Sequence, residues 1–210
     1  MGFTKETIIN ALALLGWSTE NEIFSIDELI ESFKLENVQK AAAVFDLKRF
    51  NWVSSQQLAK LDEESFFEVI KPFMEDEDIN EDSPNYEKIL LAMRTSKTNL
   101  KDIAHATRPF FFELDGYDEK GVKKFLNESH ETLIFALEVL TKLTEWNEAE
   151  LDMALIKVRD YFNLPIPKVN QPMRIALVGS TVSPSLGLTL ELFGKEKSLE
   201  RIQKAIDFIS

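Results

Sequence analysis

The 210-residue chain contains no cysteine, which excludes disulfide frameworks, thiolate metal sites and cysteine nucleophiles. It has only seven glycines and seven prolines, a low content that is typical of a mostly helical protein. No segment approaches the roughly 20 apolar residues needed to span a bilayer, and the first residues lack the basic-then-apolar layout of a signal peptide. These absences favour a helical protein of the cytoplasm with no membrane partner.

Catalytic and metal-binding signatures are also missing. The chain has two histidines, His105 and His130, which lie in separate expected helices and are more typical of surface or core residues than of ligands. There is no H-E-x-x-H, G-x-S-x-G or Walker A sequence. The acidic run at 75–82 favours a solvated loop, because adjacent carboxylates rarely converge on one ion. We therefore expect no catalytic residue, metal or cofactor in this chain.

Positive charge is scarce, and the net charge is −12. Taken alone, this argues against a nucleic-acid partner, since phosphate binding normally needs a basic surface. The charge is uneven, however. Residues 165–210 hold six basic and four acidic side chains, +6 − 4 = +2, which leaves −14 for residues 1–164. The carboxy-terminal end is therefore the better candidate for contact with an anion.

The hydrophobic pattern predicts a mainly all-α fold. Apolar residues recur at helical spacing over 4–15. Ser25 and Glu28 have the spacing of a capping box, Asp46 is placed to cap a helix over 47–52, and Ser54 or Ser55 could cap the next one. Further helices are expected at 66–70, 86–93, 100–107, 119–126, 131–143, 148–158, 188–192 and 198–209. Apolar residues 41–45 are expected to be buried, residues 173–177 fit a short strand or a helical turn, and 180–187 fit a loop.

Three stretches go beyond periodicity. Residues 10–18 read N-A-L-A-L-L-G-W-S, followed by E-I-F-S at 22–25. Residues 43–46 read A-V-F-D, followed by R-F-N-W at 49–52. Residues 171–179 read Q-P-M-R-I-A-L-V-G, followed by V-S-P-S-L-G at 182–187 and L-F-G-K-E at 192–196. In order and spacing these stretches resemble bacterial glutamyl-tRNA synthetases, class I aminoacyl-tRNA synthetases, and the resemblance covers essentially the whole chain.

The resemblance implies a carboxy-terminal fragment that lacks the catalytic Rossmann domain. Residues 1–64 would be the last part of a stem-contact domain, and 65–120 and 121–210 would be two helical anticodon-binding domains. The parent enzyme would attach glutamate to tRNA with ATP and Mg²⁺, whereas this fragment would bind tRNA without catalysis and without a cofactor. Its expected partner is tRNA(Glu), and also tRNA(Gln) in a member that does not discriminate between them, with no DNA partner and a monomeric state. The rival interpretation is an acidic helical protein-interaction module with the same fold.

The resemblance also assigns candidate anticodon contacts. Arginine suits this work, because its planar fork donates two parallel hydrogen bonds and stacks on bases. Arg174 matches the arginine of the family's Q-P-x-R motif, which the family uses on the anticodon; otherwise it is a surface arginine. Ser183, Pro184, Leu186 and Gly187 match the segment that packs around the anticodon bases; otherwise they form an ordinary helix connector.

Other candidates depend on weaker matches. Arg94 resembles the arginine of an R-x-K-T-L motif that reads the third anticodon base in discriminating members, but two extra residues here separate it from Leu100. A second departure follows Trp52, where the family's L-N-G-x-Y-I is replaced by V-S-S-Q-Q-L, so no contact is carried over there. The candidate phosphate contacts are Lys97, Lys168, Lys195 and Arg201.

Overall fold

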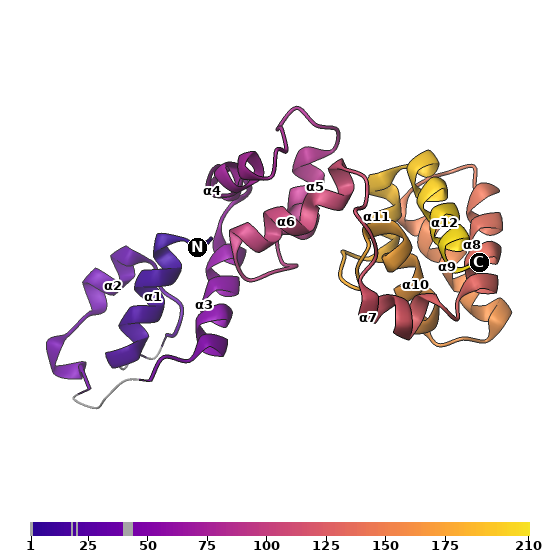
Figure 1. Ribbon diagram of the computed structural model, residues 1–210. Helices are drawn as coiled ribbons and strands as arrows, with labels where there is room; N and C mark the ends of the chain where they lie inside the picture. The colour runs from indigo at the N-terminus through magenta and orange to yellow at the C-terminus, as the bar shows by residue number, and fades with distance from the viewer. Residues whose placement is uncertain (1, 18, 20, 40–43) are drawn as a thin grey trace. The chain divides into compact units, whose positions relative to one another are not determined.

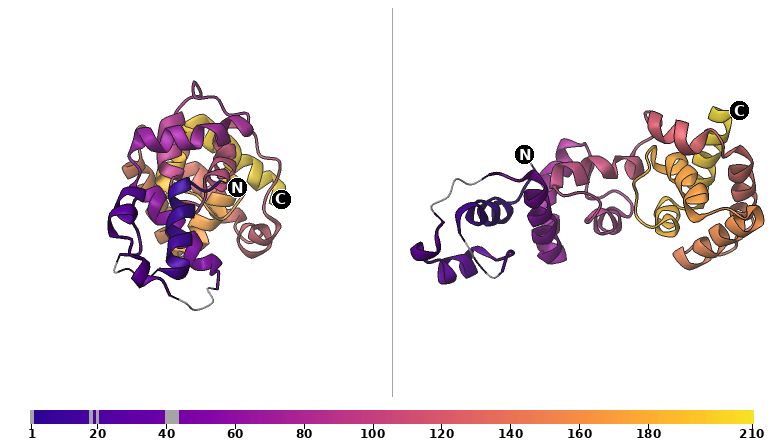
Figure 2. Two further views of the ribbon diagram at one scale, coloured as in Figure 1. Left: turned by 90° about the vertical axis from the view of Figure 1, so that its left-hand side faces the viewer. Right: turned by 90° about the horizontal axis from the view of Figure 1, so that it is seen from below.

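A computed structural model describes residues 2–17, 19, 21–39 and 44–210 (Figure 1). Over these residues the chain is helical, and its extended backbone pairs only in an isolated bridge between Trp17 and Val38. The two further views in Figure 2 likewise show coiled ribbons and connecting segments, with no strand arrow in the part of the chain that is described. The predicted all-α class is confirmed. None of the described helices combines the length and apolar character needed to cross a membrane.

The chain divides into two compact units, Met1–Thr107 and Arg108–Ser210, and the division falls inside helix α6. The boundaries predicted at 64/65 and 120/121 stay predictions, because a compact unit can contain more than one domain. The first unit contains α1 (Lys5–Gly16), α2 (Ile26–Ser32), the short helix η1 (Leu35–Asn37), α3 (Leu47–Lys60), α4 (Glu63–Asp76), α5 (Tyr86–Met93) and most of α6 (Leu100–Phe111). The second contains α7 (Glu119–Gly121), the π-helix η2 (Val122–Leu126), α8 (His130–Thr141), α9 (Glu148–Phe162), α10 (Ile166–Val178), α11 (Leu186–Phe193) and α12 (Lys195–Ile209).

Local helix signals in the first unit are confirmed where the cap is made by neighbouring residues. Ser25 accepts a hydrogen bond from the Glu28 amide, and Glu28 accepts one from the Ser25 amide, so the capping box is complete. Asp46 accepts from the amides of Lys48 and Arg49 and caps α3. Each side chain satisfies amides that have no partner within the helix.

Three other expectations are corrected. Ser54 and Ser55 do not begin a helix, because α3 continues through them to Lys60; Ser54 instead donates to the distant carbonyl of Thr98. Val44 is 86% exposed and Phe45 is 54% exposed, so the expected burial of 41–45 is wrong for these two; residues 41–43 lie outside the described part, as does Ser18 of the first motif. Residues 173–177 form the last turns of α10 and not a strand.

The second unit is built around α10. Helix α12 packs against α8, α10 and α11, and α9 packs against α8 and α11 (Figure 1). Helix α10 ends at Gly179, whose φ of +73° is a left-handed conformation that favours glycine. A Cβ at this position would lie 2.8 Å from the carbonyl oxygen of Gly116. The Asp118 amide also donates to the Gly179 carbonyl at 2.8 Å, so the segment before α7 lies directly against the end of α10.

Candidate nucleic-acid interface

Arg174 lies in α10 among residues that hold the helix in the core. Its neighbours Met173 and Ile175 are fully buried, while Arg174 itself is half-buried on the more exposed side. Its Nε donates to the Ser183 hydroxyl at 3.1 Å, and its Nη2 donates to the Pro184 carbonyl at 3.2 Å. The structure therefore brings Arg174, Ser183 and Pro184 together and fixes the plane of the guanidinium, while their contact with an anticodon stays a prediction.

The charge of Arg174 is not neutralised by a neighbour. Burial lowers the pKa of Arg174, but the guanidinium stays charged because its ordinary pKa is so high. Among the described residues no carboxylate forms an ion pair with Arg174, and its Nη1 makes no hydrogen bond. A partly desolvated cation with unused donors is suited to a ligand that brings hydrogen-bond acceptors or negative charge.

The loop that holds Arg174 is itself fixed by hydroxyl groups. The Ser183 hydroxyl lies 3.1 Å from the Thr189 hydroxyl, and the Thr189 hydroxyl donates to the Ser185 carbonyl. Ser185 is the N-cap of α11 and accepts from the Leu188 amide at 3.3 Å. The loop is therefore attached to the first turn of α11, which limits the movement of the groups that orient Arg174.

Leu186 and Gly187 serve the packing of α11. Leu186 is 2% exposed, so its side chain is placed in the core and not against a base, which corrects the predicted contact. Gly187 is buried where α11 meets α9. A Cβ at Gly187 would lie 2.5 Å from the Asp152 carboxylate and 2.9 Å from the Glu148 carbonyl oxygen. Glycine is required at 187 because α9 approaches too closely for any side chain.

Replacing Gly187 by alanine should therefore lower the free energy of unfolding of the second unit by about 1–3 kcal/mol, because an added methyl group in a packed site forces neighbours to move. Denaturant unfolding followed by hydrogen exchange in α9 and α11 measures the change. Gly16→Ala is the matched control, since a Cβ at Gly16 meets nothing within 4 Å. Equal stability of the two variants would contradict the close approach.

Three of the other residues predicted to contact RNA donate hydrogen bonds to carbonyl groups near the ends of helices. The Arg94 guanidinium donates to the carbonyls of Leu58 and Leu61, where α3 ends. The Lys195 ammonium donates to the carbonyls of Thr141 and Leu143, at 2.9 Å and 2.7 Å, where α8 ends. Such carbonyls have no partner within the helix and carry the negative end of its dipole, so a cation stabilises them. The fold alone accounts for the positions of Arg94 and Lys195.

Arg201 is the third, and it does not reach the surface. It is 2% exposed, and it donates to the carbonyls of Leu177 and Phe112. The predicted phosphate contact of Arg201 is therefore replaced by a role in the core. Lys168 is exposed at the start of α10 and pairs with Glu128 at 3.4 Å. Lys97 is half-buried in the first unit, and its predicted phosphate contact stays a prediction.

Gln171 was not among the predicted site residues, yet it lies one turn before Arg174 in α10. Its Oε1 is buried and has no hydrogen-bond partner among the described residues. Buried polar atoms are normally paired, so an unpaired one marks a place where a further donor would be favourable. The available signal was its place in the same Q-P-M-R stretch as Arg174.

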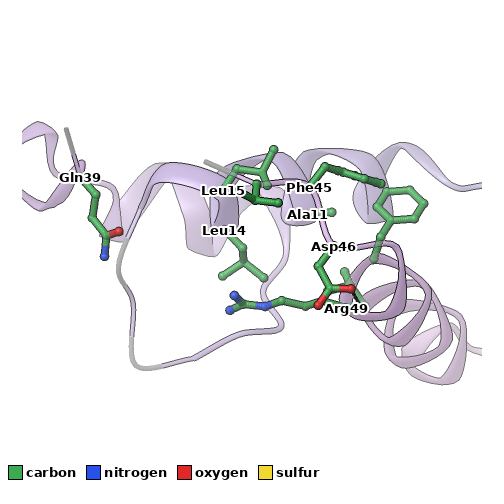
Figure 3. Close-up of a pocket in the computed structure, with 10 residues that line it drawn as sticks. Ala11, Leu14, Leu15, Gln39, Phe45, Asp46 and Arg49 are labelled. Atoms are coloured by element: carbon green, nitrogen blue, oxygen red, sulfur yellow. Dashed lines mark hydrogen bonds between the residues drawn. The ribbon is translucent and has the colours of Figure 1, made fainter. Parts of the chain in front are cut away.

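The first unit contains a different concave site, a cavity of about 300 Å³ between α1, α3 and residues 44–46 (Figure 3). Leu14 and Leu15 border it from α1, and Arg49 and Phe50 border it from α3. Its charged groups are already occupied: Arg49 pairs with Glu22 at 2.9 Å, and Asp46 caps α3. The charged side chains that border the cavity therefore already have partners among the described residues.

A family model described as "Anticodon binding domain" matches residues 57–206. This chain belongs to the anticodon-binding domain family. The matched region runs from α3 into α12, and it includes Arg94, Arg174 and the loop with Ser183 and Pro184. The first 56 residues lie outside the match.

Curated relatives of this chain include glutamate–tRNA ligases. It is 32% identical over 215 residues to glutamate–tRNA ligase 1 of Syntrophomonas wolfei, covering 100% of this chain and 43% of the relative. It is 33% identical over 213 residues to glutamate–tRNA ligase of Thermodesulfovibrio yellowstonii, covering 98% of this chain and 46% of the relative. The predicted resemblance is confirmed, and the chain spans less than half the length of the curated relatives it matches.

Solved structures give the same result. The glutamate tRNA ligase of Elizabethkingia meningosepticum, determined in complex with its amino acid, is similar with a TM-score of 0.82 and 29% identity, over 100% of this chain and 42% of that one. The glutamate–tRNA synthetase of Elizabethkingia anophelis is similar with a TM-score of 0.75 and 29% identity, over 98% of this chain and 41% of that one.

Proposed function

We propose that this chain is the tRNA-recognising part of a glutamate–tRNA ligase, and that Arg174 with Ser183 and Pro184 forms a site for the anticodon of tRNA(Glu). The family match and the ligase relatives support a tRNA partner. The observation that carries the proposal is Arg174 itself: a half-buried guanidinium that is held by two hydrogen bonds and has no acidic partner in the part of the chain that the structure describes.

The geometry suits recognition of an unstacked base. Anticodon bases are single-stranded, so they can stack on flat groups and expose their Watson–Crick edges. Ser183 and Pro184 already hold the guanidinium plane, which reduces the conformational freedom lost on binding. The unused Nη1 would donate to a base oxygen or ring nitrogen, and the face of the guanidinium would stack against the ring.

The two units differ in net charge, and the difference favours an RNA site at Arg174. The first unit has 11 basic and 20 acidic side chains, 11 − 20 = −9, and the second has 13 basic and 16 acidic side chains, 13 − 16 = −3. Phosphates would therefore meet less repulsion at the unit that contains Arg174. The rival function, an acidic protein-interaction module, is favoured by the overall charge of −12, but it gives no use for the two bonds that orient Arg174.

The longer ligase, in this proposal, joins glutamate to tRNA with ATP and Mg²⁺ in the cytoplasm, and this chain supplies binding and no catalytic group. It would act as a monomer. Whether tRNA(Gln) is also accepted would depend on the third anticodon base. Arg94 is engaged with α3 carbonyls, so it would read that base only by leaving them.

Replacing Arg174 by alanine should weaken binding of an RNA hairpin with a glutamate anticodon by about 10- to 100-fold, the range expected when one well-oriented base contact is lost. Arg174→Lys should lose most of the same affinity, because an ammonium keeps the charge but not the planar fork. Fluorescence anisotropy with the labelled hairpin, at several salt concentrations, measures both changes.

Arg159→Ala is the matched control. It removes one arginine from the same unit, and that arginine is paired with Asp160 at 2.8 Å. Its affinity for the hairpin should stay near that of the unmodified chain. An Arg174→Ala variant that binds as tightly as Arg159→Ala, or an unmodified chain that does not bind at low salt, would reject the anticodon site.

A further inference from the structure

The segment that precedes α8 carries three exposed lysines within five residues. Lys120 lies in α7, and Lys123 and Lys124 lie in the π-helix η2. A π-helix is rare and is often found at functional sites. Positions 120, 123 and 124 have the i, i+3, i+4 spacing of neighbours on one helix face, so three cationic side chains share one side of a short helical segment.

This basic segment is attached to the helix that carries Arg174. Helix η2 packs along α10, and Gly121 is so close to it that a Cβ would lie 3.0 Å from the Ile175 side chain and 3.3 Å from the Thr181 side chain. Ile175 directly follows Arg174, and Thr181 belongs to the loop that leads to Ser183. The three lysines are therefore carried by a segment that packs on the helix of Arg174, in the same compact unit.

None of the three lysines has an acidic partner among the described residues, whereas Arg159, Lys168 and Lys204 of the second unit each form an ion pair. Lys120 and Lys123 make no ion pair or hydrogen bond within the described ranges, and Lys124 lies over the Phe125 ring at 5.0 Å. By contrast, Lys204 pairs with both Glu113 and Glu200. Two acidic residues precede the lysines, but the Asp118 carboxylate accepts from the Gly121 amide at 2.6 Å and is occupied as a helix cap. The capping carboxylate keeps its negative charge, so Asp118 and the exposed Glu119 together leave residues 118–124 with +3 − 2 = +1.

We propose that Lys120, Lys123 and Lys124 form a phosphate-binding surface that contacts the tRNA backbone next to the bases read at Arg174. The inference rests on the proposed anticodon function and assigns the backbone contacts that function needs. Phosphate contacts fix the position of an RNA without reading its sequence, whereas Arg174 contacts a base. The two sets of residues should therefore affect binding in different ways.

The salt dependence of RNA binding distinguishes the lysine contacts to phosphate from the Arg174 contact to a base. Each phosphate neutralised by a lysine contributes roughly 0.7 to 0.9 to the slope of log affinity against log salt, because bound counterions are released. Two lysine contacts contribute about 1.4 to 1.8. Over a fourfold rise in salt, for example from about 50 to about 200 mM, this corresponds to an affinity change of about 7- to 12-fold.

The test compares two double variants of the full chain. Lys120→Gln with Lys123→Gln removes two lysines of the proposed surface and leaves Lys124 in place over the Phe125 ring. Lys142→Gln with Lys157→Gln removes the same charge from exposed positions at the end of α8 and in α9. Binding of the glutamate anticodon hairpin is titrated for each across the salt series. The same stem with a scrambled loop serves as a second probe.

We expect the unmodified chain to lose about 7- to 12-fold more affinity than the Lys120/Lys123 variant over that salt range, on both hairpins. The Lys142/Lys157 variant should keep the slope of the unmodified chain. Equal slopes for the two double variants, with the unmodified chain still binding the hairpin through Arg174, would overturn the phosphate surface and leave the proposed function standing. No binding of the unmodified chain would overturn both.

Discussion

Replacing Arg201 by leucine should lower the free energy of unfolding of the second unit by about 3–5 kcal/mol, because its buried guanidinium donates to two carbonyls at once, one buried and one part-buried. One is the Leu177 carbonyl near the end of α10, and the other is the Phe112 carbonyl just after α6, at 2.7 Å. Leucine would fill part of the space and leave both oxygens without a donor, at about 1–3 kcal/mol each.

The packing of Arg201 adds to this effect. Its guanidinium lies 4.6 Å from the centre of the Phe193 ring, which stacks on Phe110 at 4.7 Å with an angle of 12° between the rings. Burial lowers the pKa of Arg201, while Glu113 and Glu200 act in the opposite direction. A charge is therefore kept in the core by carbonyl groups, an aromatic face and two more distant carboxylates.

Hydrogen exchange of the full chain measures the loss, since it reports each unit separately. Amides of α10 and α12 should lose protection in Arg201→Leu. They should lose nearly as much in Arg201→Met, which keeps the length of the side chain but not its donors. Lys204→Leu, one turn further along α12, is the matched control and should change little, because its ion pairs are exposed. Unchanged protection of α10 in both Arg201 variants would show that the two carbonyl bonds contribute nothing to stability.

The burial of Arg201 could not be predicted from the sequence. An arginine in a basic carboxy-terminal region is expected to face solvent, and nothing nearby in the sequence indicates otherwise. Its burial depends on the carbonyl of Phe112, 89 residues earlier in the chain. Lys195 is similar, since its partners are the last carbonyls of α8, more than 50 residues away. Local charge patterns could not predict these contacts, because they depend on where separate helices end in space.

Contacts within a few residues were predictable for the opposite reason. The Ser25 capping box and the Asp46 cap involve partners two or three residues away, and both are present. Ser54 failed as a cap because its hydroxyl binds the Thr98 carbonyl from the middle of a longer helix. At the candidate site, Arg174 contacts Ser183 and Pro184, two residues that the resemblance assigns to the same site. The resemblance did not show that Leu186 would be buried, which depends on how closely α11 packs on α9.

Asn10, the first residue of the N-A-L-A-L-L-G-W-S stretch, holds the first unit together through a buried hydrogen-bond network. Asn10 is 1% exposed and joins three segments of the first unit. Its Nδ2 donates to the Glu22 carbonyl at 2.9 Å, and its Oδ1 accepts from the Phe24 amide at 3.3 Å and from Gln57 Nε2 at 2.7 Å. Gln57 Nε2 also donates to the Phe24 carbonyl at 2.9 Å. The network attaches the 22–24 segment to both α1 and α3.

Replacing Asn10 by leucine should lower the free energy of unfolding of the first unit by about 2–4 kcal/mol, because two backbone groups and Gln57 each lose a partner in a buried site. Gln57→Leu alone should cost about 1–3 kcal/mol, since it leaves the Phe24 carbonyl without a donor. Gln56→Leu, at the exposed neighbouring position in α3, is the control and should have little effect.

The double variant Asn10→Leu with Gln57→Leu separates a shared network from two independent sites. Once Asn10 is lost, the Gln57 amide has already lost one of its two acceptors, so removing it as well should cost less than it does alone. We expect the double variant to be more stable than the sum of the single losses predicts, by about 0.5–3 kcal/mol, as measured by hydrogen exchange of α1 and α3 amides. Single losses that add up to the loss of the double variant, to within about 0.5 kcal/mol, would show that the two amides act independently. The packing of Trp17 against Phe24, whose ring centres lie 5.6 Å apart, would then be what joins α1 to the 22–24 segment.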